Sequence, residues 1–399
     1  MNNEKRLVPK LRFPEFTHAW EQRKLGEVVE IIMGQSPNSE NYTNNPKDHI
    51  LVQGNADIKN GKVFPRTWTT QITKIGKKND LVMSVRAPVG DMAKTDYDVV
   101  LGRGVCAIRG NEFIFQLLNK MKINGYWNTL STGSTFESIN SNDIKNAQIS
   151  IPLPIEQQKI STFFTALDRY ITIHQRKLEN IQKLKKSLLQ KMFPKNDQEF
   201  PEIRFPEFTY AWEQLPFKKL ANIRRGLTYK PTDLAETGIR VLRSSNINED
   251  IFLLQNDDVF VDPKTVNIPL VQENEILITS ANGSSRLVGK HALIKGATNS
   301  VAGGFMLVAQ AKNPSFVNSL MNSTWYSKFI STYVAGGNGA IGNLSKQDLE
   351  EQLVQVPSKQ EQQKIGTFFT ALDRYITIHQ RKLENMQKLK KSLLQQMFV

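Results

Sequence analysis

Apolar residues recur at alternating steps of three and four along residues 156–194. They fall at Ile160, Phe164, Leu167, Ile171, Leu178, Ile181, Leu184 and Leu188, and His174 fills the one gap. This spacing is typical of a coiled-coil seam. We therefore predict one long helix here. From Ile160 to Met192 it would be about 50 Å long, at roughly 1.5 Å per residue.

The stretch 361–399 repeats this pattern almost unchanged. The copies differ only at Ser161/Gly366, Ile181/Met386, Lys191/Gln396 and Pro194/Val399. A narrow stripe cannot form a core alone, and the only other seam in the sequence is its own copy. We therefore expect the two helices to pack together, antiparallel, about a pseudo-twofold axis. The predicted pairing residues are Ile160, Phe164, Leu167, Ile171, His174, Leu178, Ile181, Leu188, Ile365, Phe369, Leu372, Ile376, His379, Leu383, Met386 and Leu393.

A second, shorter repeat precedes each long region. Residues 11–22 read LRFPEFTHAWEQ, and residues 203–214 read IRFPEFTYAWEQ. The chain is thus an FPEF segment, a variable domain and a long helix, taken twice. The predicted divisions are an N-terminal FPEF segment (1–21), variable domain 1 (22–155), helix 1 (156–194), a linker with the second FPEF segment (195–213), variable domain 2 (214–360) and helix 2 (361–399).

The variable domains share little sequence beyond an early glycine, Gly34 or Gly226. Short apolar runs bounded by Gly, Asn, Asp and Pro predict strands in both. The runs are 50–52, 80–85 and 99–108 in the first domain, and 239–242, 275–279 and 302–309 in the second. Helical patterns follow at 112–122 and 314–333. The predicted fold class is α+β: two globular α/β domains with twisted sheets, separated by two long antiparallel helices.

This contrast between constant and variable parts indicates two constraints. Each helix copy meets the same kind of surface, and each variable domain meets something different. Gene conversion restricted to the helices is the alternative explanation.

The amino-acid composition indicates which class of partner the chain binds. The chain has 399 residues with a net charge of +14, so several domains and a polyanionic partner, most often nucleic acid, are expected. Solvated lysine-rich helix faces would give the same charge.

No apolar run approaches the roughly 20 residues of a membrane span, and the start MNNEKRLVPK lacks a signal peptide's apolar core. We therefore expect a cytoplasmic protein without a membrane partner. The single Cys106 excludes an intrachain disulfide and a Cys-rich zinc site.

Motifs of catalysis are missing from the sequence. Residues 283–291, GSSRLVGKH, fail as a phosphate loop because five residues separate the glycines and His291 stands where Ser or Thr would hold magnesium. There is no nucleophile elbow, no dinucleotide fingerprint that follows a predicted strand and opens a helix, and no [DNS]-P-P-[YFW] tetrapeptide of amino-methyltransferases. We predict a binding protein with no catalytic residue, no metal site and no cofactor of its own.

Basic and hydrogen-bonding residues recur in glycine-rich loops of the variable domains. Arginine can pair with guanine, asparagine with adenine, and hydroxyls with phosphate, although solvated loops would carry similar residues. The clusters at 224–230 and 282–286 are favoured. The candidate DNA-binding residues are Ser84, Arg86, Arg103, Thr132, Ser134, Arg224, Arg225, Tyr229, Lys230, Arg243, Ser245, Asn246, Asn282, Ser284, Arg286 and Asn338.

His174 and His379 occupy matching positions near the helix midpoints. An antiparallel pair would bring them close, so protonation near pH 6 would loosen the seam. Two neutral core histidines are the alternative. The basic residues expected to point outward are Lys177, Lys183, Lys185, Lys186, Lys382, Lys388, Lys390 and Lys391, facing acidic partner surfaces or DNA phosphate.

The assembled chain resembles the specificity (S) subunits of type I restriction–modification systems. The resemblance rests on the FPEF…AWEQ openings, on IPLPIEQQKI before the first helix, and on the FFTALDRYI…LENIQKLKKSLLQKMF helix. Before the second helix the usual approach departs to VPSKQEQQKI.

The resemblance implies two target-recognition domains, each reading one half of a bipartite asymmetric target in double-stranded DNA. It implies helices that set the half-site spacing and bind two methyltransferase (M) subunits, which supply S-adenosylmethionine chemistry on adenine. Restriction/translocase (R) subunits join the full complex. The chain itself would not be an enzyme. A coiled-coil DNA-binding regulator or adaptor that acts without a methyltransferase is the competing class, and the missing motifs disfavour a self-contained nuclease or methyltransferase.

Overall fold

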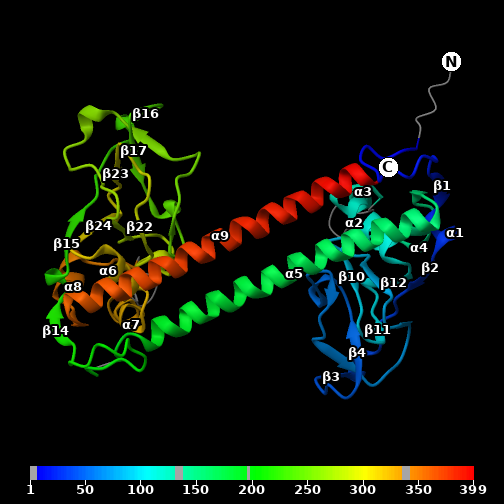
Figure 1. Ribbon diagram of the computed structural model, residues 1–399, viewed down its shortest axis with the longest axis horizontal. Coiled ribbons are helices and arrows are strands. Elements are labelled where there is room, and N and C mark those ends of the chain that lie inside the picture. The colour runs from blue at the N-terminus through cyan, green and yellow to red at the C-terminus, as the bar shows by residue number, and fades with distance from the viewer. Residues whose placement is uncertain (1–6, 131–137, 196–197, 335–341) are drawn as a thin grey trace. The chain divides into compact units, whose positions relative to one another are not determined.

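The structure, a computed structural model, describes residues 7–130, 138–195, 198–334 and 342–399. The chain forms two compact units. Unit 1 contains residues 1–175 and 381–399, and unit 2 contains residues 176–380. Each unit holds one sheet-rich domain, called here the first head (residues 21–151) and the second head (residues 213–356), together with one half of each long helix (Figure 1).

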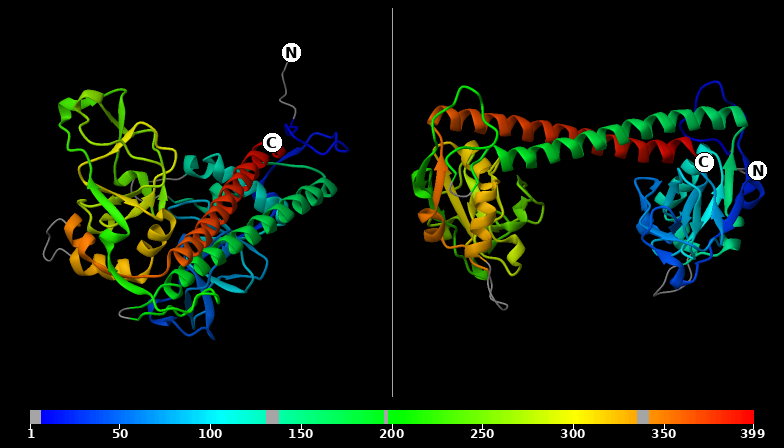
Figure 2. Two further views of the ribbon diagram at one scale, coloured as in Figure 1. Left: turned by 60° about the vertical axis from the view of Figure 1, so that its left-hand side comes forward. Right: turned by 90° about the horizontal axis from the view of Figure 1, so that it is seen from below.

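The long helices are α5 (Pro154–Lys191) and α9 (Lys359–Met397). Both begin two residues before the predicted starts, and they end at Lys191 and Met397 rather than at 194 and 399. Pro154 suits the first helical position, where the backbone has no hydrogen bond to donate. In each unit the two helix halves lie side by side (Figures 1 and 2).

In each unit the start of one long helix lies beside the end of the other, so the two halves run antiparallel, and an ion pair joins them. In unit 1, Lys390 lies 2.6 Å from Asp168, and in unit 2 the equivalent Lys185 lies 2.6 Å from Asp373. Lys185 and Lys390 therefore do not point outward as expected, since their side chains are only 12% and 21% exposed. Each is held between the helices, and Lys185 also contacts Asp250 of the second head.

The predicted seam is buried to different degrees along its length. The buried members are Ile160, Phe164, Leu178, Ile365, Phe369, Ile376, Leu383 and Met386, and the partly buried ones are Leu167, Ile171, His174, Ile181, Leu188, Leu372, His379 and Leu393. Leu184 is different, at 53% exposed. A helix of 3.6 residues per turn drifts by about 20° per heptad against a 3.5-residue pattern. Near that end of the helix the contact has moved to Lys185 and Leu189.

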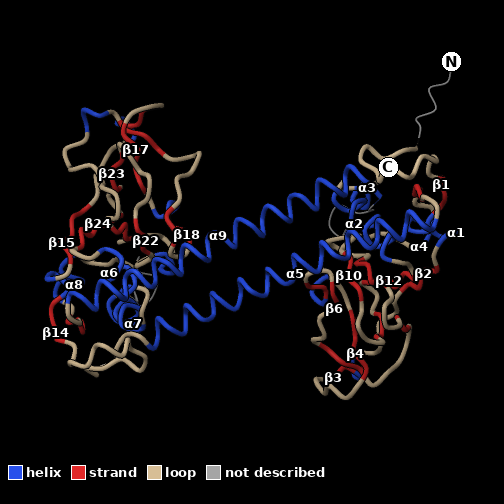
Figure 3. The backbone as a smooth tube through the Cα atoms, in the orientation of Figure 1, coloured by secondary structure: helices blue, strands red, loops and turns tan. Residues whose placement is uncertain are grey.

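In its described residues the first head consists of short strands and short helices (Figure 3). The strands are β1 (Glu21–Lys24), β2 (Glu30–Met33), β3 (Tyr42–Thr43), β4 (His49–Val52), β5 (Ile58–Lys59), β6 (Lys62–Val63), β7 (Thr67–Thr69), β8 (Ile75–Gly76), β9 (Leu81–Ser84), β10 (Met92–Lys94), β11 (Val99–Leu101), β12 (Val105–Arg109) and β13 (Gln148–Ile151). The helices are α1 (Leu25–Val28), α2 (Glu112–Ile123), α3 (Tyr126–Leu130) and α4 (Ser141–Lys145). One sheet has the order β2-β12-β9-β10-β6-β5, the other β3-β7-β4-β11-β8, and β1 pairs with β13.

The second head has the same plan. Its strands are β14 (Glu213–Pro216), β15 (Ala221–Arg225), β16 (Leu234–Ala235), β17 (Ile239–Leu242), β18 (Ile247–Asn248), β19 (Ile251–Phe252), β20 (Val259–Val261), β21 (Ile276–Thr279), β22 (His291–Leu293), β23 (Ser300–Ala302), β24 (Met306–Ala311) and β25 (Leu353–Val356). Its helices are α6 (Pro314–Met321), α7 (Thr324–Tyr333) and α8 (Lys346–Glu351). The sheets have the orders β15-β24-β21-β22 and β16-β20-β17-β23, with β14 against β25 and β18 against β19. In both heads one pair of the second sheet is parallel, β4 with β11 and β17 with β23.

Three predicted elements are each divided in two. The predicted strand 99–108 is β11 and β12, and 302–309 falls in β23 and β24, because a glycine-containing turn separates each pair. The predicted helix 314–333 is α6 and α7. Asn322 ends α6, and the Ser323 hydroxyl donates to the Leu320 carbonyl at 2.7 Å instead of continuing the helix. Such side chains compete with the helical backbone for hydrogen bonds.

The FPEF segments hold the start of each long helix. Arg12 makes two hydrogen bonds of 2.7 Å with the Glu156 carboxylate, and Arg204 bonds Glu361 at 2.8 and 2.7 Å. The carboxylates of both glutamates are almost fully buried. Arginine and carboxylate fit each other in this two-bond geometry. Both helix starts carry the same buried glutamate, and each glutamate is paired with the arginine of the preceding FPEF segment. This pairing accounts for the repeat of the segment together with the helix.

Each head's core also includes the end of the other long helix. In unit 1, Phe398 packs against Trp20, Phe113 and Phe164, with ring centroids 5.1 to 6.0 Å apart. In unit 2 the matching residue Phe193 packs against Trp212, Phe316 and Phe369. Each unit therefore needs both helices to complete its core.

Candidate nucleic-acid interface

Both heads contain an equivalent turn at the point where the chain passes from one sheet to the other. In the first head it is Gly102–Val105, between β11 and β12, and in the second it is Gly303–Met306, between β23 and β24. Within the turn, the amide of Val105 donates to the Gly102 carbonyl at 3.2 Å, and that of Met306 to Gly303 at 2.8 Å. The turn has the same backbone form in two heads of different sequence.

Further backbone hydrogen bonds connect each turn to neighbouring strands. The amides of Gly34 and Gly226 donate to the carbonyl of the last turn residue, both at 3.0 Å. The amide of the first turn glycine donates to the carbonyl of the adjacent parallel strand, Gly102 to Val52 at 2.7 Å and Gly303 to Leu242 at 2.8 Å. This explains the shared early glycine. A β-carbon at Gly34 would lie 2.1 Å from the Gly102 carbonyl oxygen, and one at Gly226 would lie 1.9 Å from that of Gly303.

In the second head this turn adjoins three of the loops that the sequence pointed to. The Phe305 carbonyl accepts hydrogen bonds from the amides of Ser280 and Ala281, at 2.9 and 3.2 Å, just before the 282–286 loop. The Asn282 amide donates to the Ser244 hydroxyl at 3.0 Å, which joins that loop to residues 243–246. A β-carbon at Gly304 would lie 3.2 Å from the Thr228 hydroxyl, which places the turn beside residues 224–230.

The predicted residues on this surface differ in exposure. Arg225, Lys230, Ser245, Ser284 and Arg286 are exposed, and Tyr229, Arg243 and Asn282 are partly exposed. Arginine, lysine, hydroxyl and amide groups on adjoining loops can bind phosphate oxygens and base edges. The tertiary structure thus brings together groups that lie far apart in the sequence.

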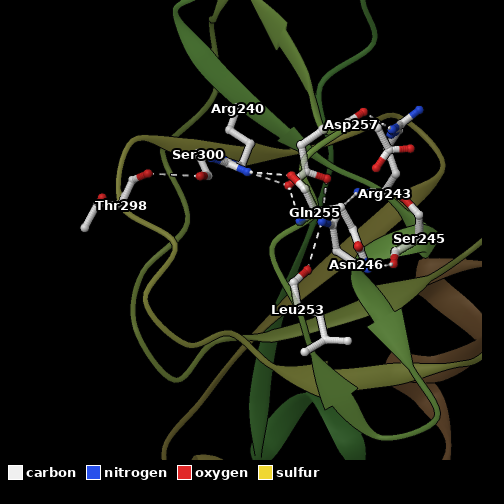
Figure 4. Close-up of polar contacts among 10 residues, drawn as sticks. Arg240, Arg243, Ser245, Asn246, Leu253, Gln255, Asp257, Thr298 and Ser300 are labelled. Carbon is white, nitrogen blue, oxygen red and sulfur yellow. Dashed lines mark hydrogen bonds and ion pairs between the residues drawn. The ribbon is translucent and has the colours of Figure 1, made fainter. Parts of the chain in front are cut away.

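Two predicted residues of the second head serve the fold. Arg224 holds the buried Glu275 carboxylate with two contacts of 2.5 and 2.6 Å. Asn246 is fully buried and donates to Asp258 at 2.7 Å, while Arg240 binds the same carboxylate at 2.5 Å (Figure 4). Asn246 also accepts a hydrogen bond from the Arg243 amide at 2.7 Å. The contacts of Asn246 hold the loop that carries Ser245 in place. Because Arg224 and Asn246 both bind buried carboxylates, neither is directed at a ligand.

In the first head, Arg86 and Arg103 are exposed and Ser84 is not. The Ser84 hydroxyl is buried, donates to the Pro88 carbonyl at 2.7 Å and accepts from the Asp91 amide at 2.8 Å. It therefore shapes the loop that presents Arg86. Arg103 lies in the turn itself, and its amide donates to the Ser36 hydroxyl at 3.1 Å. The predicted residues Thr132, Ser134 and Asn338 lie outside the residues that the structure describes.

Phe305 is 73% exposed at this surface, although it is not among the predicted site residues. The apolar run 302–309 predicts one continuous strand through this position. The pair Gly303–Gly304 before it was the signal for a turn.

The ionisable groups with the largest pKa shifts are buried inside the heads. Burial raises the pKa of the Cys106 thiol to about 12 and lowers the pKa of His291 to about 4. Over the described ranges, no group of three or more His, Cys, Asp or Glu side chains is arranged to hold a metal ion. None of the described helices combines the length and apolar character that crossing a bilayer requires. The predicted meeting of His174 and His379 stays a prediction, because they belong to different units.

Comparison with known proteins gives a consistent family. The model of the type I restriction modification DNA specificity domain matches the chain twice, over residues 18–183 and 211–388. Among curated proteins of Methanocaldococcus jannaschii, a putative type I restriction enzyme MjaX specificity subunit is 32% identical over 195 residues, covering 47% of this chain and 45% of that protein. The MjaVIII specificity subunit is 21% identical over 276 residues, covering 66% of this chain and 64% of its own length. The chain thus spans less than two thirds of these two relatives.

Two solved structures share the fold. The type I restriction–modification S subunit from M. genitalium has a TM-score of 0.65 at 17% identity, covering 98% of this chain and 99% of that one. A chain from a structural study of complex assembly and conformational transition in the type I R-M system has a TM-score of 0.54 at 16% identity, covering 94% and 96%.

Proposed function

The chain belongs to the type I restriction modification DNA specificity family, and on that premise we propose that its heads each read one half of a bipartite, asymmetric target in double-stranded DNA. One observation carries this proposal. The heads share a backbone plan, including the same inter-sheet turn, but present different polar side chains around it. A common frame with different exposed groups is what two readers of different base sequences require.

The long helices, we propose, bind two copies of a methyltransferase subunit. Residues 156–194 and 361–399 differ at only four positions, so the exposed Lys183 and Lys186 of α5 recur as Lys388 and Lys391 of α9. Two equal surfaces suit two equal partners. In this proposal the chain is the non-catalytic subunit of an adenine-N6 methyltransferase and type I restriction endonuclease complex. S-adenosylmethionine binds to the methyltransferase subunits, and restriction/translocase subunits join the complete complex.

Exchange of one head tests the assignment of half-sites. Residues 215–355 would be replaced by the matching region of another specificity subunit, and the complex with its methyltransferase would be expressed in cells lacking other adenine methylation. Sequencing of methylated adenines should show a changed second half-site and an unchanged first half-site. The exchange of residues 22–148 is the matched control, for which the opposite half should change. Alteration of both half-sites by either exchange would refute independent reading.

Co-purification separates this function from its competitor. If the chain were a regulator or adaptor, it would bind one DNA sequence tightly without a methyltransferase. Recovery of a stable complex with two methyltransferase copies, and S-adenosylmethionine-dependent methylation by that complex but not by the isolated chain, is the expected result.

A further inference from the structure

The tip of the inter-sheet turn carries different side chains in the two heads. The backbone hydrogen bonds align Gly102, Arg103 and Gly104 of the first head with Gly303, Gly304 and Phe305 of the second. The turn therefore presents one large side chain in each head, a guanidinium group at the middle position or a phenyl ring one residue later.

The backbone of Phe305 is fixed while its ring is exposed. Its carbonyl accepts the amides of Ser280 and Ala281, and the flanking Met306 amide closes the turn on Gly303 at 2.8 Å. The side chain is nonetheless 73% exposed. The matching carbonyl of Gly104 accepts the Val85 amide at 2.9 Å, so the support is common to both heads. An exposed aromatic residue on a rigid turn loses little conformational entropy when it binds a partner.

The loops that adjoin the turn carry polar groups. The Asn282 side-chain amide of one loop donates to the Ser244 hydroxyl of another, and the Thr228 hydroxyl would lie 3.2 Å from a β-carbon at Gly304. The turn glycines themselves add no side chain beside the ring. The arrangement is one exposed ring on a turn whose adjoining loops carry hydroxyl and amide groups. It suits DNA, where apolar contacts to thymine methyl groups or base faces occur among polar contacts to base edges and phosphates.

We propose that Phe305 is a specificity-determining residue that makes an apolar contact with a base of the second half-site, and that Arg103 is its counterpart for the first half-site. This inference rests on the proposed function. It adds that the identity of the side chain at the tip of one turn sets part of the recognised sequence in each head.

The test uses the full chain in complex with its methyltransferase and a pool of double-stranded oligonucleotides with randomised positions. After selection for binding, Phe305→Ala should lose base preference at one or two positions of the second half-site and keep the first half-site. Affinity for the wild-type target should fall about 10- to 100-fold, as for loss of a base contact, with little change in affinity for random DNA. Arg103→Ala should lose preference only in the first half-site.

Two further variants serve as controls for the effect of Phe305→Ala. Phe64→Ala removes another ring, 52% exposed, that lies outside the turn, and it should leave both half-sites unchanged. Phe305→Arg places in the second head the kind of side chain that the first head carries, and it should introduce a guanine preference near the affected position. Because Phe305 is exposed, the thermal midpoint of all these variants should match that of the wild type.

Several outcomes overturn the inference. Selection of the same sequences by Phe305→Ala would do so, as would an equal loss of affinity for target and random DNA, or failure of the variant to retain the methyltransferase. If the wild-type complex itself selects no bipartite sequence, the proposed function fails instead. The wild-type selection thus distinguishes the two failures.

Discussion

Buried carboxylates decide which arginines of the second head face outward. Glu275 and Asp258 have almost no exposed surface, and they bind Arg224 and Arg240. An unpaired buried charge costs several kcal/mol, so each carboxylate keeps its arginine. Arg225 and Arg286 are exposed and can bind DNA phosphate. Arg224 and Arg225 are neighbours in one sequence cluster, but the first binds a buried carboxylate and the second is exposed to solvent.

His291 gives a prediction at the scale of a single residue. Burial against Tyr326, with Lys185 and Asp250 as the nearby charges, lowers its pKa to about 4 from 6.5. Between these values the unfolded chain binds the proton and the folded chain does not. Stability should therefore fall as the pH is lowered from 6.5 to 4, by about 3 kcal/mol from this residue. Above pH 6.5 the contribution of His291 to the slope fades as the unfolded imidazole loses its proton.

Urea denaturation at about pH 7 and pH 4.5 would measure this effect. The difference in unfolding free energy between the two pH values should be smaller for His291→Phe than for the wild type, because the other titrating groups are common to both. Equal pH dependence in the two proteins would contradict a buried neutral imidazole.

At the scale of elements, each long helix is stabilised by a seam that changes character along its length. Leu178 is 8% exposed, whereas Leu184, in the same apolar pattern, is 53% exposed. Beyond that point Lys185 lies between Asp373 of the other helix and Asp250 of the second head. Two carboxylates raise the pKa of this lysine against the opposing effect of burial, so it stays charged. The ion pairs specify the relative position of α5 and α9 where the apolar stripe has turned away.

Alanine substitutions at these two leucines should have different costs. Leu178→Ala leaves a cavity in the seam and should lower the unfolding free energy by about 2 to 4 kcal/mol. Leu184→Ala is the matched control, and its effect should stay within about 0.5 kcal/mol. Urea denaturation of both variants measures the difference, and similar losses would mean that the heptad pattern, rather than the observed burial, describes the pairing. The equivalent pair Leu383 and Leu389 offers a repeat of the test.

At the scale of the whole molecule, each unit is assembled from parts that are distant in sequence. The core of unit 1 contains the first FPEF segment, the first head, the start of α5 and the end of α9. That of unit 2 contains the matching parts of the second repeat and the end of α5. A change in helix length therefore affects the two units together, and this makes helix length a candidate determinant of half-site spacing.

Shortening both helices by one heptad tests this role. Removal of residues 177–183 and 382–388 keeps Asp168, Lys185, Asp373 and Lys390, which form the ion pairs. At about 1.5 Å per residue and about 3.4 Å per base pair, the spacing between half-sites should shrink by about three base pairs. Sequencing of methylated adenines measures the spacing. Recovery of the original spacing by a stably folded variant would exclude the helices as its determinant.

The sequence by itself determined the large-scale organisation, because repeats and apolar periodicity are local patterns. The seam positions, the two FPEF segments and the strands at 50–52, 239–242 and 275–279 could be predicted from such patterns, although Leu184 shows the limit of a fixed repeat. The tertiary structure alone decided which polar residues form a surface. Ser84, Arg224 and Asn246 are of the right type for DNA, but Ser84 is itself buried and the other two bind buried carboxylates. Phe305, which no polar pattern marks, is exposed at the turn. Exposure and pairing depend on residues brought close by folding, and spacing along the chain does not contain that information.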